Sequence, residues 1–202
     1  TSAEYSRTEL IDIFLKICDA TSYAHSNGVL HLDLKPENIR IDDFGDVQLC
    51  DWGLARLIDG TDKITDEFGS LEQYSLNQED MNKLTVDGYI KGTPGFMAPE
   101  QAGSTEDRKG IPTDVYSLGV ILYFILSYKE PFRGEINTVI AKTLEGDFCK
   151  PSVHRENIPK ALESICLKAM SLRAAERYNS VGAMKDDILS YRNGYLTSAE
   201  EK

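Results

Sequence analysis

The sequence lacks three features that would place it in other classes of protein. The longest apolar run, Leu118 to Leu126, is interrupted at Gly119 and falls far short of the roughly 20 residues of a membrane-spanning helix. The four cysteines are scattered without a CxxC pair, which favours free thiols in a reducing cytoplasm over disulfides or a metal site. Basic residues number 22 against 33 acidic ones, and the net charge of -11 argues against nucleic acid or an anionic membrane as the main partner.

What the sequence does contain is a set of helical patterns. At 202 residues and 41% hydrophobic content, it predicts one soluble domain with a substantial core. Ser6 and Glu9 have the spacing of a capping box, and the apolar helix that follows should end near Asn27-Gly28. Residues 113–126 are apolar on all sides, which indicates a central buried helix. Further amphipathic helices are predicted at 136–146, 162–170 and 181–191.

One short β-structure interrupts these helices. Residues 39–41 and 47–50 alternate in polarity on either side of a glycine-containing turn at 42–46, which predicts a β-hairpin. The expected fold class is therefore mainly α, with an α+β character that comes from this hairpin. The last residues, 197–202, are polar, and we expect them to fray.

The chain is organised around residues 31–38, His-Leu-Asp-Leu-Lys-Pro-Glu-Asn, which follow the first helix. In phosphoryl transfer, an acid such as Asp33 can accept the proton of an attacking hydroxyl, and Lys35 can neutralise the moving phosphoryl group. The side-chain oxygen of Asn38 can hold a magnesium ion, and Asp51 adds a second carboxylate thirteen residues later. Taken alone, an acid, a lysine and an asparagine are more often just a polar loop after a helix.

Three further segments decide between these interpretations. Residues 92–100 are Gly-Thr-Pro-Gly-Phe-Met-Ala-Pro-Glu, residues 114–119 are Asp-Val-Tyr-Ser-Leu-Gly, and Arg177 follows near the end. Their types, order and spacings, together with the loop, resemble the eukaryotic-type protein kinases, in the bacterial-like Ser/Thr branch. The resemblance covers nearly the whole chain. It implies a kinase C-terminal lobe over residues 1–202, with a catalytic loop at 31–38, an activation segment at 51–100 and a helical subdomain at 101–195.

The resemblance assigns chemical roles to the polar residues. Asp33 matches the catalytic base, and Lys35 is the residue that Ser/Thr kinases place two positions later. Thr93 matches the threonine that bonds both of them and helps to exclude tyrosine substrates. ATP and magnesium are the implied cofactors. The residues matched to them are Lys35, Asn38 and Asp51, with Asn38 and Asp51 as metal ligands, and Arg40 where the family usually places an apolar residue under the adenine ring.

The resemblance also implies a set of structural contacts. His31 is expected to stack beneath Trp52, which replaces the usual phenylalanine. Asp114 should bond the backbone of the catalytic loop. Glu100 and Arg177 should form a buried ion pair that ties the end of the activation segment to the lobe.

Two features of the activation segment depart from the family pattern. Leu32 stands where most regulated kinases carry an arginine that binds a phosphate on this segment, so activation through that contact is not expected. Thr85 and Thr93 nevertheless remain candidate phosphorylation sites. At 50 residues the segment from 51 to 100 is longer than usual, and we expect an insert at about 57–84.

The largest departure is the missing N-terminal lobe. No glycine-rich loop, strand lysine or partnering helix glutamate precedes residue 8, and the chain starts with Thr rather than Met. We therefore expect a Ser/Thr kinase large lobe that acts on Ser and Thr of protein substrates but is inactive without a small lobe. The alternative is a non-catalytic, pseudokinase-like docking module. The sequence upstream of Thr1 would discriminate the two, because a glycine-rich loop and a lysine there would favour the kinase.

Overall fold

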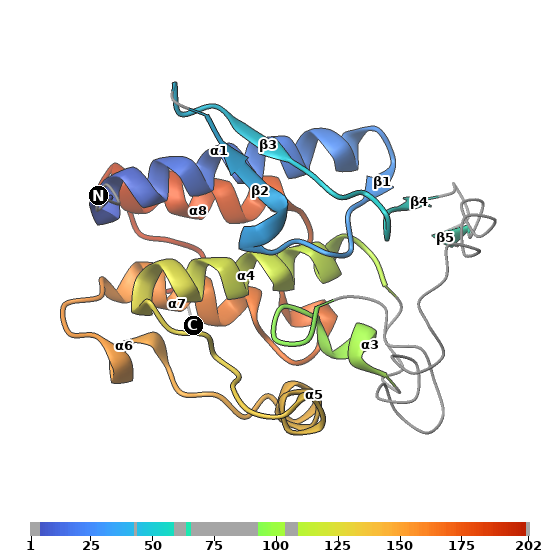
Figure 1. Ribbon diagram of the computed structural model, residues 1–202. Helices are drawn as coiled ribbons and strands as arrows, with labels where there is room; N and C mark the ends of the chain where they lie inside the picture. Colours follow the sequence, from blue (N-terminus) through green and yellow to red (C-terminus); the bar gives the residue numbers. More distant parts are fainter. Residues whose placement is uncertain (1–4, 43, 59–63, 66–92, 104–108, 201–202) are drawn as a thin grey trace.

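A computed structural model describes residues 5–42, 44–58, 64–65, 93–103 and 109–200 of this chain (Figure 1). Helix α4, Ile111–Ser127, runs through the middle, between α1, Arg7–Ser26, on one side and α7, Lys160–Ala169, on the other. Helix α8, Val181–Arg192, packs beside α1 and α7. The predicted mainly helical fold with a small antiparallel sheet is confirmed.

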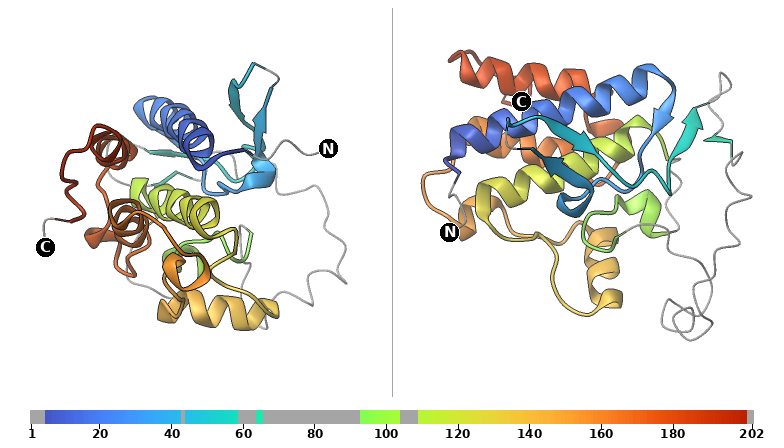
Figure 2. Two further views of the ribbon diagram at one scale, coloured as in Figure 1. Left: turned by 90° about the vertical axis from the view of Figure 1, so that its left-hand side faces the viewer. Right: turned by 45° about the horizontal axis from the view of Figure 1, so that its top comes forward.

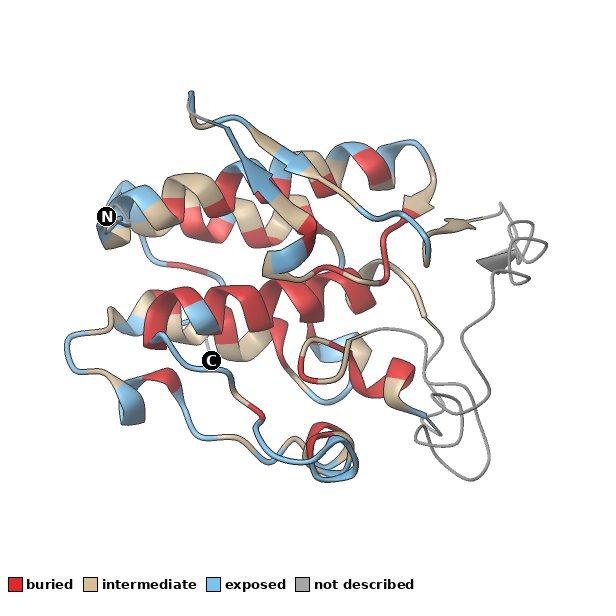
Figure 3. Cartoon of the chain, viewed as in Figure 1, coloured by how far each residue is buried: buried red, intermediate tan, exposed pale blue. Residues whose placement is uncertain are grey.

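The central helix is buried because almost every residue along it is apolar or small. Fourteen of its residues are buried, and Figure 3 shows them as an almost continuous band. Gly119 lets α7 approach closely, since a Cβ atom there would lie 2.8 Å from Cγ of Met170 and 2.9 Å from Cβ of Ala169. The helix begins two residues before the predicted start, with Pro112 in its first turn.

Helix α1 begins and ends as the sequence predicts. The backbone nitrogen of Ser6 donates to Glu9 at 2.7 Å, and the backbone nitrogen of Glu9 donates to the Ser6 hydroxyl at 3.3 Å, which completes the capping box. The helix stops at Asn27, followed by Gly28 with a φ of 74°. This stop sets the point where the chain turns toward the loop at 31–38.

The strands form two small antiparallel sheets. The predicted hairpin consists of β2, Ile39–Ile41, and β3, Val47–Leu49, with Ile39 opposite Leu49. A second sheet of β1, Val29–Leu30, β4, Arg56–Ile58, and β5, Ile64–Thr65, is not predicted by the sequence pattern. Leu57 and Ile58, at the start of the expected insert, therefore belong to a strand that pairs with both β1 and β5.

The remaining helical elements are α5, which is as long as α7, and four short turns of helix. Figure 2 shows the hairpin on one side of the helices and α5 on the opposite side. Among the described residues, no helix is both long and apolar enough to cross a membrane. The elements not yet named are η1, Pro36–Asn38; α3, Pro99–Ala102; α5, Ile136–Glu145; α6, Pro151–His154; and η3, Ala174–Glu176.

The expectation that the tail frays is wrong through residue 200. Thr197 is fully buried, and the backbone nitrogens of Ser198 and Ala199 donate to the carboxylate of Asp187 in α8. The Tyr178 hydroxyl donates to the same carboxylate at 2.7 Å. Burial opposes ionisation of Asp187, but the hydrogen bonds from Tyr178 and Ser198 outweigh it and lower the pKa of the carboxyl. A buried ionised acid thus binds the tail to the domain.

Candidate active site

The first turn of α4 holds the loop at 31–38 through the side chain of Asp114. The carboxylate of Asp114 accepts hydrogen bonds from the backbone nitrogens of His31, at 2.9 Å, and Leu32, at 2.8 Å. The side-chain nitrogen of Gln101 in α3 donates to the Leu32 carbonyl at 2.7 Å. Leu32 has a φ of 62°, which is costly for a branched side chain, so these bonds to both sides of its backbone maintain the turn.

A second histidine completes the support of this loop. Nε2 of His25, in the last turn of α1, lies 2.8 Å from Asp114, and both side chains are almost completely buried. Because an ionised carboxylate can only accept, Nε2 is the donor. Sequence reasoning missed His25, since its partner lies 89 residues away and no local pattern connects them.

Asp33 is the centre of a compact polar cluster. Its Oδ1 accepts from the backbone nitrogen and the hydroxyl of Thr93, both at 3.1 Å. Its Oδ2 lies 3.0 Å from Nζ of Lys35 and accepts from Nδ2 of Asn38, also at 3.0 Å. Lys35 in turn donates to the Thr93 hydroxyl. The structure therefore brings together Asp33, Lys35, Asn38 and Thr93, which are 60 residues apart at the extremes.

Asn38 connects this cluster to the hairpin. It ends the η1 turn that Pro36 begins, and its backbone carbonyl accepts from the nitrogen of Cys50 at 2.8 Å. Its side-chain nitrogen is directed at Asp33, which leaves the side-chain oxygen for another partner. The hairpin thereby joins Asn38 at its start to Asp51 just beyond its end.

Asp51 is exposed and differs from the cluster in its surroundings. Its φ is 58°, and within the described part of the chain its carboxylate accepts only from the nitrogen of Gly53, at 3.3 Å. No group of three or more His, Cys, Asp or Glu residues among those described could hold a metal. Asn38 and Asp51 are hard oxygen donors, and magnesium commonly uses one or two protein oxygens together with phosphate and water. This donor pair fits magnesium.

His31 and Trp52 lie against each other, with ring centroids 4.5 Å apart and a 46° angle between the planes. Nε2 of His31 is 3.1 Å from the Cys50 carbonyl and donates to it. Nδ1 accepts from the backbone nitrogen of Asp33 at 3.3 Å, which defines the neutral tautomer. This histidine therefore supports the loop on the hairpin side.

Glu100 and Arg177 form a buried pair behind the loop. The guanidinium donates from Nη1 to Oε1 at 2.7 Å and from Nη2 to Oε2 at 2.8 Å, and both side chains are at most 1% exposed. The Thr113 hydroxyl also donates to Glu100, at 2.8 Å. The guanidinium uses further donors on backbone carbonyls, including that of Pro112. These contacts join α3 to α4 and η3.

Arg40 lies apart from the cluster, and Thr85 is not among the described residues. Arg40 is exposed in β2, opposite Gln48 of β3. Thr85 lies outside the described residues, as does most of the expected insert at 57–84. Leu32 is only 5% exposed, so its side chain belongs to the core rather than to the surface of the loop.

The loop at 31–38 thus brings an acid, a lysine and an asparagine together with Thr93, and buried acid–base pairs support it. The chain belongs to the protein kinase domain family, whose model matches residues 1–188. It is 40% identical over 189 residues to a serine/threonine-protein kinase PknD of Protochlamydia amoebophila, covering 92% of this chain and 18% of that protein. Identity to the PknD of Chlamydia caviae is 35% over 184 residues, which is 91% of this chain and 19% of that one. The chain thus spans about a fifth of the length of these relatives.

Proposed function

We propose that residues 1–202 are the large, C-terminal lobe of a Ser/Thr protein kinase that transfers the γ-phosphoryl group of ATP to protein Ser and Thr hydroxyls. The catalytic loop would be residues 31–38, the activation segment 51–100 and the helical subdomain 101–195. One observation carries the proposal: Lys35, Asn38 and Thr93 all contact the carboxylate of Asp33. Family membership and the names of the PknD relatives support the same activity.

In this proposal Asp33 orients the substrate hydroxyl and takes its proton. The hydroxyl oxygen forms a bond to the γ-phosphorus while the bond from that phosphorus to the β–γ bridging oxygen breaks. Lys35, 3.0 Å from Asp33, compensates the negative charge of the phosphoryl group in transit. Thr93 holds Oδ1 of Asp33 through two hydrogen bonds, so Oδ2 keeps a defined direction. Positioning of this kind is the main contribution of a protein to phosphoryl transfer.

The nucleotide side of the site uses the residues around the hairpin. Asn38 and Asp51 would hold Mg²⁺, which would neutralise part of the negative charge of the nucleotide phosphates when bound. Arg40 would lay its stem under the adenine ring. Asp51 and Arg40 are exposed, whereas Asn38 is buried beside Asp33, and we propose that a small lobe covers this side of the site. The large lobe alone would then be inactive, and the complete kinase would act in the cytoplasm.

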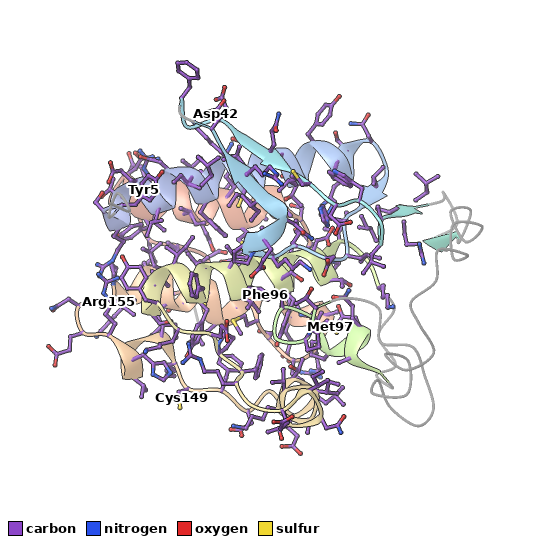
Figure 4. The ribbon with its side chains drawn as sticks, in the orientation of Figure 1. Tyr5, Asp42, Phe96, Met97, Cys149 and Arg155 are labelled. Atoms are coloured by element: carbon purple, nitrogen blue, oxygen red, sulfur yellow. The ribbon has the colours of Figure 1, made fainter. Side chains whose placement is uncertain are left out.

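The substrate side of the site is hollowed beside Thr93. A cavity of about 390 Å³ extends from Thr93 and Phe96 toward α5, and its wall includes Glu37 and Phe132. Figure 4 labels Phe96, which lies next to the central helix. A cavity that starts at the residue bonded to Asp33 suits a peptide whose hydroxyl must reach that acid.

The first test is Asp33→Asn in a protein that contains both lobes. The substitution keeps the size of the side chain but removes the base, so turnover on Ser and Thr peptides should fall by about 10²–10⁴. Asp46→Asn is the matched control, because that side chain is 80% exposed at the hairpin turn and should leave turnover unchanged. The chain without a small lobe should show no turnover in the same assay.

One observation favours a second candidate, a non-catalytic docking module. Leu32 is buried and apolar, so it offers no group that could bind a phosphorylated activation segment. Near-normal turnover of Asp33→Asn, or no turnover by the two-lobed protein with all its residues intact, would favour this docking function over catalysis.

A further inference from the structure

A second cavity lies at the opposite end of α1 from the catalytic loop. Its volume is about 600 Å³, and it is lined by Tyr5, Ser6, Arg7, Leu10, Tyr128 and Arg155. The cavity lies at the first turn of α1, a helix of 20 residues, whereas the loop at 31–38 follows the other end of that helix in the chain. Figure 4 shows Tyr5 and Arg155 on the same side of the molecule, away from the labelled Phe96.

The cavity concentrates positive charge in a protein with a net charge of -11. Among the described residues, neither Arg7 nor Arg155 forms an ion pair, and no acidic residue lines the cavity. Four other arginines in the described part do pair with carboxylates. They are Arg133, Arg173, Arg177 and Arg192. The two cavity arginines therefore retain their charge for a ligand from outside.

Both guanidinium groups have donors to spare. Arg7 donates from Nη1 to the Asn157 carbonyl at 2.9 Å, but its Nε is buried and has no partner among the described residues. Arg155 donates from Nη1 to the Leu126 carbonyl at 3.5 Å, which is long for a hydrogen bond. A buried donor without an acceptor is unfavourable, so an anionic oxygen that accepted a hydrogen bond from Nε of Arg7 would stabilise the cavity.

Two tyrosines add aromatic surface to the cavity. The guanidinium of Arg155 lies 4.3 Å from the centre of the Tyr128 ring, in a stacking arrangement that holds it in place. Tyr5 and Tyr128 are 47% and 46% exposed, so part of each ring is available to a ligand. The cavity thus offers two planar cations with aromatic surface beside them. It is also within the range of about 300–1,000 Å³ typical of ligand sites.

We propose that this cavity binds a phosphorylated Ser or Thr side chain within a protein segment. Guanidinium groups match the oxygens of a phosphate with paired hydrogen bonds, and the tyrosine rings suit the residues that flank it. The choice of a phosphorylated segment rests on the proposed function, because a Ser/Thr kinase produces such groups on itself and its substrates. The cavity shares none of its lining residues with the loop at 31–38, so it would dock a product or a regulatory segment, and the reacting hydroxyl would lie elsewhere.

The test is binding of a fluorescent phosphothreonine peptide to the full-length protein, followed by anisotropy without ATP or magnesium. The unphosphorylated peptide and inorganic phosphate serve as competitors. Arg155→Gln should weaken binding of the phosphopeptide about tenfold or more, equivalent to about 1.4 kcal/mol. Arg173→Gln is the control, since that side chain is 76% exposed at the start of η3, near the first turn of α4, whereas the cavity lies beyond the last turn of α4 at Tyr128, and it should leave binding unchanged.

A thermal unfolding curve for each variant separates loss of binding from loss of fold. Arg155→Gln is preferred to Arg7→Gln for the main test, because Arg7 has the firmer bond to the backbone. Equal binding of the unphosphorylated peptide, equal competition by inorganic phosphate, or no effect of Arg155→Gln would each overturn the proposal. The assay involves no phosphoryl transfer, so its failure would leave the proposed catalytic function untouched, and loss of turnover would leave the docking result untouched.

Discussion

The two sides of the loop at 31–38 are built differently. Toward the helices, the charged residues Asp114, Glu100 and Arg177 are buried, and each bonds several partners. Toward the hairpin, Asp51 and Arg40 are exposed, with few contacts to the rest of the lobe. The contacts that position Asp33 therefore lie among the described residues, whereas Asp51 and Arg40 make few contacts there.

Physical chemistry explains why this division occurs. A charge removed from water must be paired and hydrogen-bonded. On the helix side of the loop, which we call the inner side, each buried charge therefore needs all of its partners. On the hairpin side, which we call the outer side, an exposed carboxylate remains solvated without a partner and stays available to a metal ion. The comparison makes a simple prediction: substitutions on the inner side should cost stability and activity together, and those on the outer side should cost activity alone.

The largest effect on stability is expected for Arg177→Met. It leaves the Glu100 carboxylate buried without its partner, and loss of one member of such a pair costs about 3–5 kcal/mol in the free energy of unfolding. Denaturant unfolding measures this cost. The double variant Arg177→Met with Glu100→Leu removes both charges and should recover much of the loss. A cost under about 1 kcal/mol for the single substitution would show that this pair contributes little to the stability of the inner side.

A smaller effect on stability is expected for Asp114→Asn. The amide has one acceptor oxygen where the carboxylate has two, so a donor among His25, His31 and Leu32 loses its partner, at about 1–3 kcal/mol. The Leu32 backbone would then be less firmly held at its positive φ, and turnover in the two-lobed protein should fall as well. Unfolding and turnover are measured on the same preparation.

Asp186→Asn is the control for this substitution, because Asp186 is exposed on α8 and has the same chemistry. A loss of stability in Asp114→Asn without any loss of turnover would break the link between the two properties. The inner side would then serve the fold alone, and the position of Asp33 would have to depend on Thr93 and Lys35 instead.

Local patterns predicted the parts of the fold that local interactions determine. The capping box of Ser6 and Glu9, the hairpin turn and the helical periods each depend on residues close together in the chain, and the structure contains them. The resemblance to kinases, rather than any pattern, implied the contacts of Asp114 and of the Glu100–Arg177 pair. Those contacts span 77 to 83 residues, which a periodicity cannot indicate.

The features that were missed have physical reasons of the same kind. Strands β1 and β5 have two residues each, too short for an alternating pattern to emerge, and β1 pairs with a segment 28 residues away from Val29. The tail looks polar, yet Asp187 supplies acceptors for its backbone nitrogens and so holds it down. His25 has its role only because Asp114 lies beside it in the folded chain.

The smallest effect on stability is expected for Asp51→Asn, and it sharpens the comparison most. The side chain is exposed, and an asparagine oxygen can still accept from Gly53, so the free energy of unfolding should change by no more than about 0.5 kcal/mol. Asparagine also tolerates the positive φ of 58° well.

Turnover in the two-lobed protein should nevertheless fall, because a neutral ligand holds magnesium less firmly than a carboxylate. Raising the magnesium concentration should then restore part of the rate, whereas Asp33→Asn should gain nothing from the same series. Turnover of Asp51→Asn that stayed low at every magnesium concentration would assign Asp51 a role other than metal binding, and a large loss of stability would show that the outer side is as much part of the fold as the inner one.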